Sequence, residues 1–367
     1  MSFLNQPSLR ALRLTARPLL WLWLASGALA VGSAGATEPD TPARVRDLAY
    51  GTVLYEYYQG NAFEALSRLS VADARGGIIG HGANPELVEG GLMLAYGMTR
   101  EARALFESML DGQVTSSRRN QAWFYLGKVL YLEDDKAGAN GALAHVEPEA
   151  LAEEAPGLYP EWLYLRGQLA LQTGQAGVSE WLAKMPDDNL WGAYLRYNRA
   201  IRQVTDGQRA PAIDGLTVLA EQLAQTLDRQ PDRNDTAERQ ALRDRTLLTV
   251  GQLQLEAGDE TQARAVLAKI RLDSVFSDEA LFHFAVAAAH DRDFGLALRA
   301  LDTLQRRPLF TPWLQQVPYA RGFVFEQMGH QQQALDAYRS AAEHYQSLSG
   351  QLAREQANLS ETRLNDA

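Results

Sequence analysis

The sequence predicts an all-α protein in which one small pair of helices is repeated about eight times to form an α-solenoid. The first observation is an alanine that recurs five residues after a turn residue, with spacings of 34 or 37 residues. The pairs are Gly60/Ala65, Gly97/Ala102, Asp134/Ala139, Gly258/Ala263, Arg292/Ala297 and Gly329/Ala334. The second is apolar spacing of the helical type around these turns. Such a period indicates stacked supersecondary units, which usually offer binding surfaces.

The N-terminus has the layout of a secretory signal peptide. Arg10, Arg13 and Arg17 make a basic start, the apolar run LLWLWLASGALAV follows at 19–31, and small residues at 34–36 supply a cleavage site. We expect cleavage near Ala36. The alternative is an uncleaved anchor, but a membrane span needs about 20 apolar residues. The absence of Cys after the apolar run excludes a lipid-anchored lipoprotein.

Charge and cysteine content narrow the function classes. Residues 1–36 hold three Arg and no acid, so the rest of the chain carries 32 basic and 45 acidic residues, a formal charge of −13. This balance argues against nucleic acid and against anionic lipid as partners. The chain has no Cys, which removes thiol nucleophiles and cysteine-based metal sites. A chain of this length can rely on its apolar core without disulfides.

The third repeat shows the pattern most clearly. Trp123, Leu126, Gly127 and Leu130 share one expected helix, and Ala139 lies on the next. The segment AWFYLGKVLY followed by Ala139 resembles a tetratricopeptide repeat (TPR), whose pattern is W-x2-L-G-x2-Y and then an Ala on the second helix. The chain is thus identified as an exported TPR-type protein. The resemblance implies a right-handed α-solenoid of about eight TPR-like helix pairs over residues 37–345.

The same frame extends over most of the chain. The other repeats are expected at 43–71, 85–110, 160–185, from about 190, and at 241–270, 278–304 and 318–345. Repeat four has Ser179 at the usual Ala position, and repeat five has Asn198 at the usual Gly position. Irregular segments are expected at 73–84, 228–238 and 306–318. Residues 346–367 are expected to extend the last helix and then fray.

The sequence contains no good match to a known catalytic, phosphate-binding or metal-binding motif. The glycines at 76–82 lack the G-K-[ST] ending of a phosphate-binding loop. His283 and His290 are seven residues apart on one expected helix, whereas a metal pair usually uses i, i+4 spacing with a carboxylate. The loop around Asp232 lacks the Gly and Glu of a calcium loop. No G-x-S-x-G occurs. We therefore expect no enzyme activity, no catalytic residue, no metal and no cofactor.

The TPR resemblance implies a binding groove along the first helices. In that family, positions 2, 5, 9, 12 and 13 of each first helix face the concave side. Tyr, Phe and Arg on protein surfaces are typical hot-spot residues, although these aromatics could equally pack between repeats. The expected groove residues are Tyr50, Tyr57, Tyr58, Phe124, Lys128, Tyr131, Tyr164, Arg199, Arg202, Phe282, His290, Tyr319 and Phe323.

The sequence therefore favours a periplasmic scaffold or adaptor that binds protein partners of the cell envelope, in an assembly or secretion/export system. This choice follows the family resemblance, and a fold alone does not fix a function. The alternative is a glycan-binding or glycan-cleaving helical solenoid protein. We expect no nucleic-acid partner and no membrane insertion after the signal is cleaved.

Overall fold

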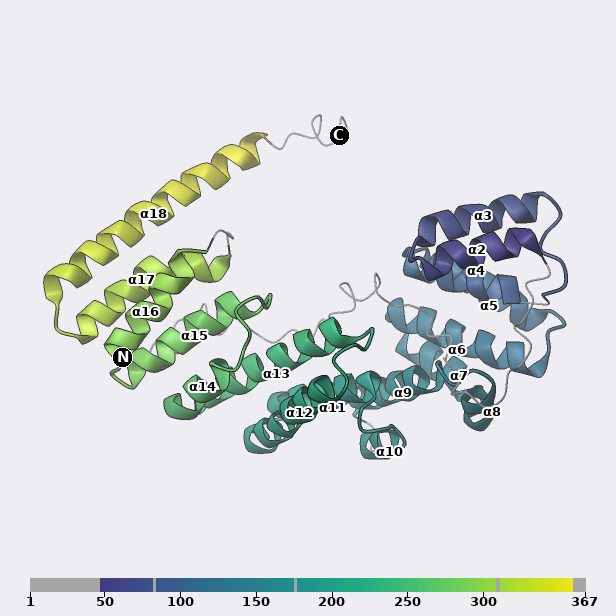
Figure 1. Cartoon of the computed structure of the whole chain (residues 1–367), viewed down its shortest axis with the longest axis horizontal. Coiled ribbons are helices and arrows are strands. Elements are labelled where there is room, and N and C mark those ends of the chain that lie inside the picture. The colour runs from purple at the N-terminus through teal and green to yellow at the C-terminus, as the bar shows by residue number, and fades with distance from the viewer. Residues whose placement is uncertain (1–46, 82–83, 175–176, 308–310, 359–367) are drawn as a thin grey trace. The chain divides into compact units, whose positions relative to one another are not determined.

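The computed structural model describes residues 47–81, 84–174, 177–307 and 311–358, and all regular secondary structure in these ranges is α-helical (Figure 1). The expected signal peptide lies outside the described residues. The helices are α2 (Leu48–Tyr58), α3 (Ala62–Ala74), α4 (Asn84–Ala95), α5 (Thr99–Asp111), α6 (Ser116–Leu132), α7 (Lys136–Ala144), α8 (Pro148–Glu154), α9 (Tyr159–Thr173), α10 (Val178–Ala183), α11 (Leu190–Thr205), α12 (Arg209–Arg229), α13 (Thr236–Ala257), α14 (Glu260–Leu267), α15 (Ser277–His290), α16 (Phe294–Gln305), α17 (Pro312–Gln327) and α18 (Gln331–Asn358).

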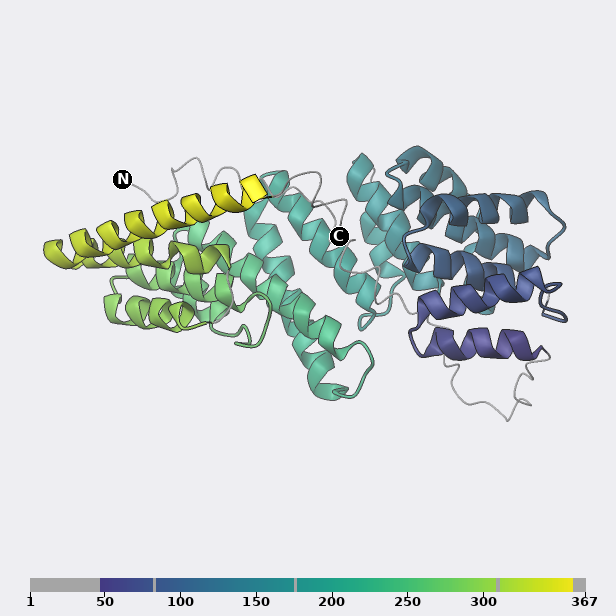
Figure 2. The same cartoon turned by 90° about the horizontal axis from the view of Figure 1, so that it is seen from above.

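The chain divides into two compact units, a first unit up to Arg199 and a second unit from Ala200. In the first unit α2 packs on α3, α4 on α5, α6 on α7 and α9 on α10. In the second unit α13 packs on α14, α15 on α16 and α17 on α18. Figure 2 shows these antiparallel pairs from a second direction. The expected all-α helical repeat fold is confirmed, while its right-handed course stays a prediction.

Each repeat is stacked on the next through the same helices. The first helices of neighbouring repeats touch, α4 with α6 and α6 with α9 in the first unit, and α13 with α15 and α15 with α17 in the second. Second helices also reach the following repeat, as α5 reaches α6 and α14 reaches α15. The first helices therefore form a continuous surface within each unit, and this surface is where the candidate site lies.

The alanines that open the second helices are buried, as their spacing predicted. Ala65, Ala102, Ala139, Ala263 and Ala297 are 0% exposed, and Ala334 is 5% exposed. The residue five positions earlier has a left-handed backbone in all six cases, with φ between 59° and 82°. A tight turn followed by a buried small residue lets the second helix fold back closely on the first.

Repeat five has a frame that differs from the prediction by two residues. Gly207 has φ +80°, and Ala212, five residues later, is fully buried together with Leu216. In most other repeats the small residue of the first helix lies twelve positions before the buried Ala, as Gly127 lies before Ala139. The same distance from Ala212 leads to Ala200, which is 3% exposed. The prediction of Asn198 at the small-residue position was therefore wrong. Its side chain does not face the second helix of its repeat but donates through Nδ2 to the hydroxyl of Tyr164 at 3.5 Å.

Repeat four departs from the regular helix pair. Its second helix, α10, has only six residues. A Cβ on Gly167 would meet Leu195 of α11, whereas in the regular repeats the corresponding Gly meets the repeat's own second helix.

The connection before repeat four contains the additional helix α8, which packs on α6 and α9 and which the sequence pattern did not predict. Pro148 at the first turn of α8 was the available signal.

The three expected irregular segments have different outcomes. Residues 75–81 and 230–235 lie outside helices, within the wider segments predicted at 73–84 and 228–238. The third prediction, 306–318, was too long because α17 begins at Pro312 and contains Pro318. Thr311 caps this helix, since its hydroxyl accepts a hydrogen bond from the amide of Leu314 at 3.4 Å. Pro at the first turn suits a helix start, and a later Pro removes only one backbone hydrogen bond.

The two ends of the described chain are held in different ways. Near the start, Asp47 caps α2 and also accepts a hydrogen bond from the amide of Ile79 at 3.1 Å, which ties the glycine-rich loop to the first helix. At the other end α18 continues to Asn358, well beyond the length of α17 (Figure 1). The described residues contain no helix that is long and apolar enough to span a membrane.

Candidate interaction surface

The thirteen predicted groove residues differ sharply in exposure. Five aromatic rings are buried, three side chains are half-buried and five are exposed. The buried ones are Tyr50, Phe124, Tyr131, Tyr164 and Phe282; the half-buried ones are Tyr57, Lys128 and Phe323; the exposed ones are Tyr58, Arg199, Arg202, His290 and Tyr319. The buried rings pack inside and between repeats, so they do not offer the aromatic contact surface that the sequence suggested. The partner-binding role of the whole set stays a prediction.

In the first unit, tyrosine hydroxyls and side-chain amides form a hydrogen-bonded row across α6, α9 and α11. The hydroxyl of Tyr131 accepts from Gln172 Nε2 at 3.3 Å, and that of Tyr164 accepts from Gln168 Nε2 at 2.9 Å. Burial raises the pKa of both tyrosines, so both stay neutral hydrogen-bonding groups. Burial likewise raises the pKa of Tyr50 to about 12. The tyrosine hydroxyls thus hold three amides in place, of which that of Gln172 is exposed, that of Asn198 is half-buried and that of Gln168 is buried.

Lys128 lies in the same row but already has an acidic partner. Its Nζ is 2.6 Å from Glu161 Oε1, and the side chains are 26% and 11% exposed. The pair joins α6 to α9 at positions 9 and 2 of successive first helices. Lys128, one of the predicted groove residues, is therefore already paired and less available to a ligand carboxylate. Glu161 was not among the predicted residues, although it occupies position 2 of repeat four.

Arg199 and Arg202 are affected by the frame correction in repeat five. With Ala200 at the small-residue position, they move off the positions that the TPR pattern assigns to the groove. Both are exposed, and Arg202 Nε donates to both carboxylate oxygens of Asp206 at 3.0 Å. The residues that take the groove positions instead are Tyr194, Tyr197, Ile201, Val204 and Thr205.

In the second unit, a polar cluster joins three successive first helices. Gln252 of α13 donates through Nε2 to Glu279 Oε1 of α15 at 2.8 Å, and the same nitrogen is 3.1 Å from His283 Nε2. The indole of Trp313, at the start of α17, lies 5.1 Å from the His283 ring. Of these four residues the sequence analysis named only His283, and only as half of an improbable metal pair. Glu279 and Gln252 occupy positions 2 and 9, which the repeat frame could have identified.

His290, Phe323 and Tyr319 lie farther along the same surface. His290 Nδ1 is 3.6 Å from Glu260 Oε1, and its ring is 6.5 Å from that of Phe323 in an edge-on arrangement. Tyr319 is 5.5 Å from Tyr338 between ring centroids. In the described part of the chain no group of three His, Cys, Asp or Glu side chains could hold a metal ion.

The contact that decides the repeat type lies, in the regular repeats, between the small residue of the first helix and a large residue sixteen positions later. A Cβ on Gly127 would lie 2.6 Å from Leu143, and one on Gly251 would lie 2.6 Å from Leu267. Gly90 meets Phe106 and Gly322 meets Tyr338 in the same way. This is the small-residue packing, with its buried Ala between, that the TPR pattern requires. The chain is a TPR-type helical repeat protein.

Solved structures of TPR proteins are similar to this chain at low identity. One is a tetratricopeptide repeat protein from Parabacteroides merdae, with 13% identity and a TM-score of 0.42, covering 74% of this chain and 98% of that chain. A Rap protein complexed with competence and sporulation factor has 13% identity and a TM-score of 0.39, covering 83% and 98%. The TPR domain of P58(IPK) has 14% identity and a TM-score of 0.26, covering 81% and 92%. No protein-family model and no curated protein matches the chain.

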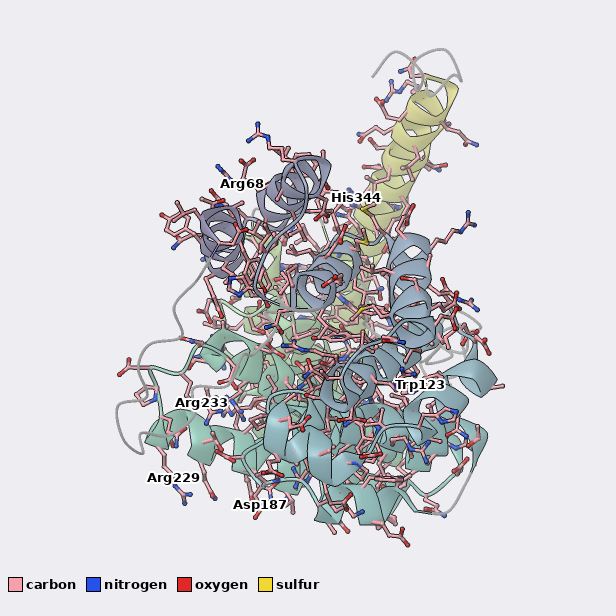
Figure 3. The ribbon with its side chains drawn as sticks, turned by 90° about the vertical axis from the view of Figure 1, so that its right-hand side faces the viewer. Arg68, Trp123, Asp187, Arg229, Arg233 and His344 are labelled. Atoms are coloured by element: carbon pink, nitrogen blue, oxygen red, sulfur yellow. The ribbon has the colours of Figure 1, made fainter. Side chains whose placement is uncertain are left out.

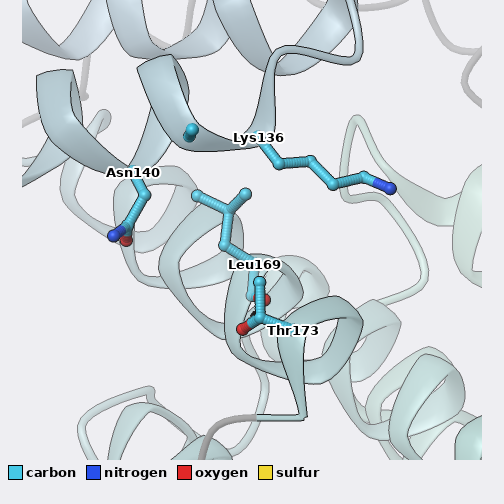
Figure 4. A pocket seen from close by; sticks show the side chains of 5 residues that line it. Lys136, Asn140, Leu169 and Thr173 are labelled. Carbon is cyan, nitrogen blue, oxygen red and sulfur yellow. Dashed lines mark hydrogen bonds between the residues drawn. The ribbon is translucent and has the colours of Figure 1, made fainter.

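A shallow pocket lies beside the TPR surface of the first unit, between α7 and α9 (Figure 4). Its volume is about 230 Å³, and it is lined by Lys136, Ala137, Asn140, Leu169 and Thr173. The lining contains no carboxylate. Asn140 Oδ1 accepts from Arg166 Nη1 at 2.8 Å, and Lys136 Nζ is 3.4 Å from Asp134. The pocket therefore lacks the acid–base pair that glycoside cleavage needs.

Proposed function

We propose that this chain is an exported scaffold or adaptor that binds protein partners of the cell envelope through the first-helix surfaces of its TPR-type repeats. The observation that carries the proposal is the row of fixed amides and hydroxyls in the first unit. Gln172 is exposed, and its bond to the Tyr131 hydroxyl fixes its orientation. A side-chain amide has the same donor and acceptor as a peptide group. Such a row suits an extended polypeptide, which displays peptide groups along its length.

Export is the second part of the proposal and is supported by sequence alone. The basic start, the apolar run at 19–31 and Ala34-Gly35-Ala36 have the order and length of a cleaved signal. Export would place the surface in the periplasm, where assembly, secretion and export systems operate. The net negative charge of the rest of the chain is compatible with a protein partner.

The glycan-cleaving alternative required a buried Glu in a deep cleft. Glu161 is 9% exposed, but it is bound to Lys128 at 2.6 Å. An acid for glycoside cleavage must be free to donate a proton to the leaving group, whereas the Glu161 carboxylate is engaged by Lys128. We therefore propose the binding function and not the glycan-cleaving one.

Site-specific photo-crosslinking in the producing cells tests the binding surface. A photoreactive phenylalanine analogue replaces Gln172 on α9 in one variant and Ala104, an exposed residue of the second helix α5, in the control. We expect one defined protein adduct from position 172 and a much weaker one from position 104. Equal adducts from both positions would reject the first-helix surface as the binding site.

N-terminal sequencing of the protein from fractionated cells tests export. We expect the mature chain to begin at or near Thr37 and to be found in the periplasmic fraction. A mature chain that still contains Trp21 and Trp23 would reject a cleaved signal.

A further inference from the structure

We propose that Glu279, Gln252, His283 and Trp313 form a site for a cationic side chain, arginine or lysine, of a protein partner. The proposal rests on the proposed function, because it assigns the chemistry of one contact on the first-helix surface. It concerns the second unit, whereas the row of amides and hydroxyls described above belongs to the first unit.

The helix starts around the site are fixed by hydrogen bonds. Thr311, which caps α17, donates to Asp278 Oδ2 at 3.1 Å, and Arg307 Nη1 lies 3.1 Å from Asp278 Oδ1. Asp278 is buried in the first turn of α15. These bonds hold the start of α17, which carries Trp313, against the start of α15, which carries Glu279. A preorganised site loses less entropy when a ligand binds.

The described partners of the Glu279 carboxylate are the amide of Gln252 and the imidazole of His283. Glu279 Oε1 accepts from Gln252 at 2.8 Å and lies 3.7 Å from His283 Nε2. Within the described ranges no Lys or Arg pairs with it. By contrast, Asp244 is paired with Arg271 and Glu256 with Arg209. The Glu279 side chain is 24% exposed, so its carboxylate can be reached from solvent.

The Trp313 ring lies beside His283, whose Nε2 is 3.7 Å from this carboxylate. The Trp313 ring lies 5.1 Å from His283 and 5.4 Å from Phe282, and Phe282 is buried behind it. Trp313 itself is half-buried. The face of an indole attracts a cation, most strongly when solvent is partly excluded. A carboxylate with an adjacent indole therefore favours a guanidinium or ammonium group, which forms a charge-assisted hydrogen bond with one and stacks on the other.

The net charge of the chain agrees with a cationic ligand. The full sequence has 35 basic and 45 acidic residues, so the long-range field favours approach of positive groups. A sugar would also use an indole and an amide, and its hydroxyls can donate to a carboxylate, but it carries no positive charge for the carboxylate to attract. We therefore argue for a basic peptide, and binding of a glycan is an outcome that the test can reveal.

Fluorine NMR of the purified protein labelled with 5-fluorotryptophan tests the site. Trp313 is the only Trp after residue 191, and Trp313→Phe assigns its resonance by loss of one signal. The probes are acetyl-Gly-Arg-Gly-amide and the same peptide with citrulline, a neutral analogue of arginine. We expect a saturable shift of the Trp313 resonance with the arginine peptide and about tenfold weaker binding of the citrulline peptide.

Glu279→Gln is the decisive variant, and Glu256→Gln is its control because Glu256 is already paired with Arg209 at 2.9 Å. We expect about a tenfold loss of affinity for the arginine peptide in the first and no change in the second. Equal binding of both peptides, or full affinity in Glu279→Gln, would overturn the cationic site. A Trp313 shift with chitotetraose and none with the arginine peptide would overturn it in favour of a sugar. Photo-crosslinking at position 172 reports on the scaffold function separately.

Discussion

At the residue scale, the turn residue before each second helix is under the strictest backbone constraint. Eight such residues have left-handed φ values, and six of them are glycines, at 60, 97, 174, 207, 258 and 329. The other two are Asp134 with φ 62° and Arg292 with φ 59°. A residue with a Cβ loses roughly 1–2 kcal/mol in this conformation, whereas glycine adopts it readily. The turn geometry is thus maintained at some cost in two repeats.

Replacing Arg292 by glycine should therefore stabilise the protein. We expect Arg292→Gly to raise the free energy of unfolding by about 0.5 kcal/mol, which is the relief of the left-handed strain less the extra chain entropy of glycine. The measurement is the urea midpoint. Arg306→Gly is the control, because Arg306 caps α16 with an ordinary φ of −82°. A gain of the same size in the control would contradict the explanation by backbone strain.

Gly127 has the opposite role, since it provides space and not backbone freedom. A Cβ there would lie 2.6 Å from Leu143, so Gly127→Leu should destabilise the protein by about 1–3 kcal/mol or more by forcing α6 and α7 apart. Gly141→Ala on α7 is the control, because nothing lies within 4 Å of its added Cβ. The control should be neutral or stabilising, since Ala favours helix by up to about 1 kcal/mol. Thermal melts in which Gly127→Leu loses only a few tenths of a kcal/mol would show that the helix contact is misplaced.

The sequence could predict these packing positions but not the exposure of the aromatic rings. A small residue at a fixed distance from a turn has one explanation, the close crossing of two helices. A Tyr on a first helix has two, because it can face solvent or fill the gap to the next repeat. Tyr58 is 63% exposed and Tyr131 is 7% exposed, although both were assigned to the same surface. Only the neighbouring helices decide between these outcomes.

At the element scale, a polar side chain seven residues before the small residue of a first helix bonds to a residue near the end of the same repeat. This second residue follows the second helix in three repeats and lies within α18 in the fourth. Four repeats share this feature, which we call the exit clasp. Its members are Asn120 with Glu147, Asp244 with Arg271, Asp278 with Arg307 and Gln315 with His344, which is labelled in Figure 3. Asn120, Asp244 and Asp278 are buried. The clasp closes each helix pair at its open end, opposite the turn.

Breaking one clasp should destabilise its repeat. Asp244 is 0% exposed, and its Oδ2 accepts from Arg271 Nε at 3.0 Å. We expect Asp244→Asn to lower the free energy of unfolding by about 1–3 kcal/mol, because Arg271 loses its charged partner. This loss of unfolding free energy should be smaller than for an ion pair in which both side chains are buried, because the Arg271 side chain is 34% exposed and can be solvated.

Two measurements check the clasp. Asp214→Asn on α12, an exposed position, should leave the urea midpoint unchanged. The double variant Asp244→Asn with Arg271→Gln should lose less than the sum of the two single variants, because the second change removes the unpaired charge. Strictly additive losses would mean that the two side chains do not act as a pair.

The start of α13 should make the protein sensitive to acid. Burial alone would raise the pKa of Asp235, but hydrogen bonds from Arg239 and Arg233 outweigh burial and hold the pKa below its usual 3.8. A lowered carboxyl pKa stabilises the folded state above the usual value, and this contribution is lost as the pH falls through the folded pKa. We expect the stability difference between wild type and Asp235→Asn to be constant near neutral pH and to shrink below about pH 4. Urea unfolding at several pH values measures it, and a difference that stays constant down to pH 2.5 would contradict this role.

Regular elements were easier to predict than irregular ones. The turn–alanine spacing located the second helices of six repeats, because their packing repeats the same contact. It could not locate α8, which lies between repeats and has no copy elsewhere in the described chain. Repeat five was misplaced because Asn198 stands two residues before the buried Ala200, and the pair Gly207 and Ala212 was overlooked.

At the scale of the whole molecule, nearly all the contacts described above are local. Each clasp and each small-residue contact joins helices of one repeat or of adjacent repeats. Stability in such an array is approximately a sum of repeat and nearest-neighbour terms, so a defect spreads only to neighbouring repeats. The two compact units have their own apolar clusters, around Phe124 and Leu163 in the first and around Ala288 and Leu301 in the second.

The locality of these contacts gives a prediction for the whole chain. Gly127→Leu should increase amide hydrogen exchange in α6 and α7 and, to a lesser extent, in their neighbours α5 and α9. It should leave α13 to α18 unchanged, because free energies of local opening differ between parts of a repeat array. Gly251→Leu is the matched variant, since its Cβ would lie 2.6 Å from Leu267 of α14 and the effect should appear in the second unit only. Mass spectrometry of peptic fragments measures both patterns. If either variant increases exchange uniformly from α4 to α18, the units unfold together and the array is a single cooperative structure.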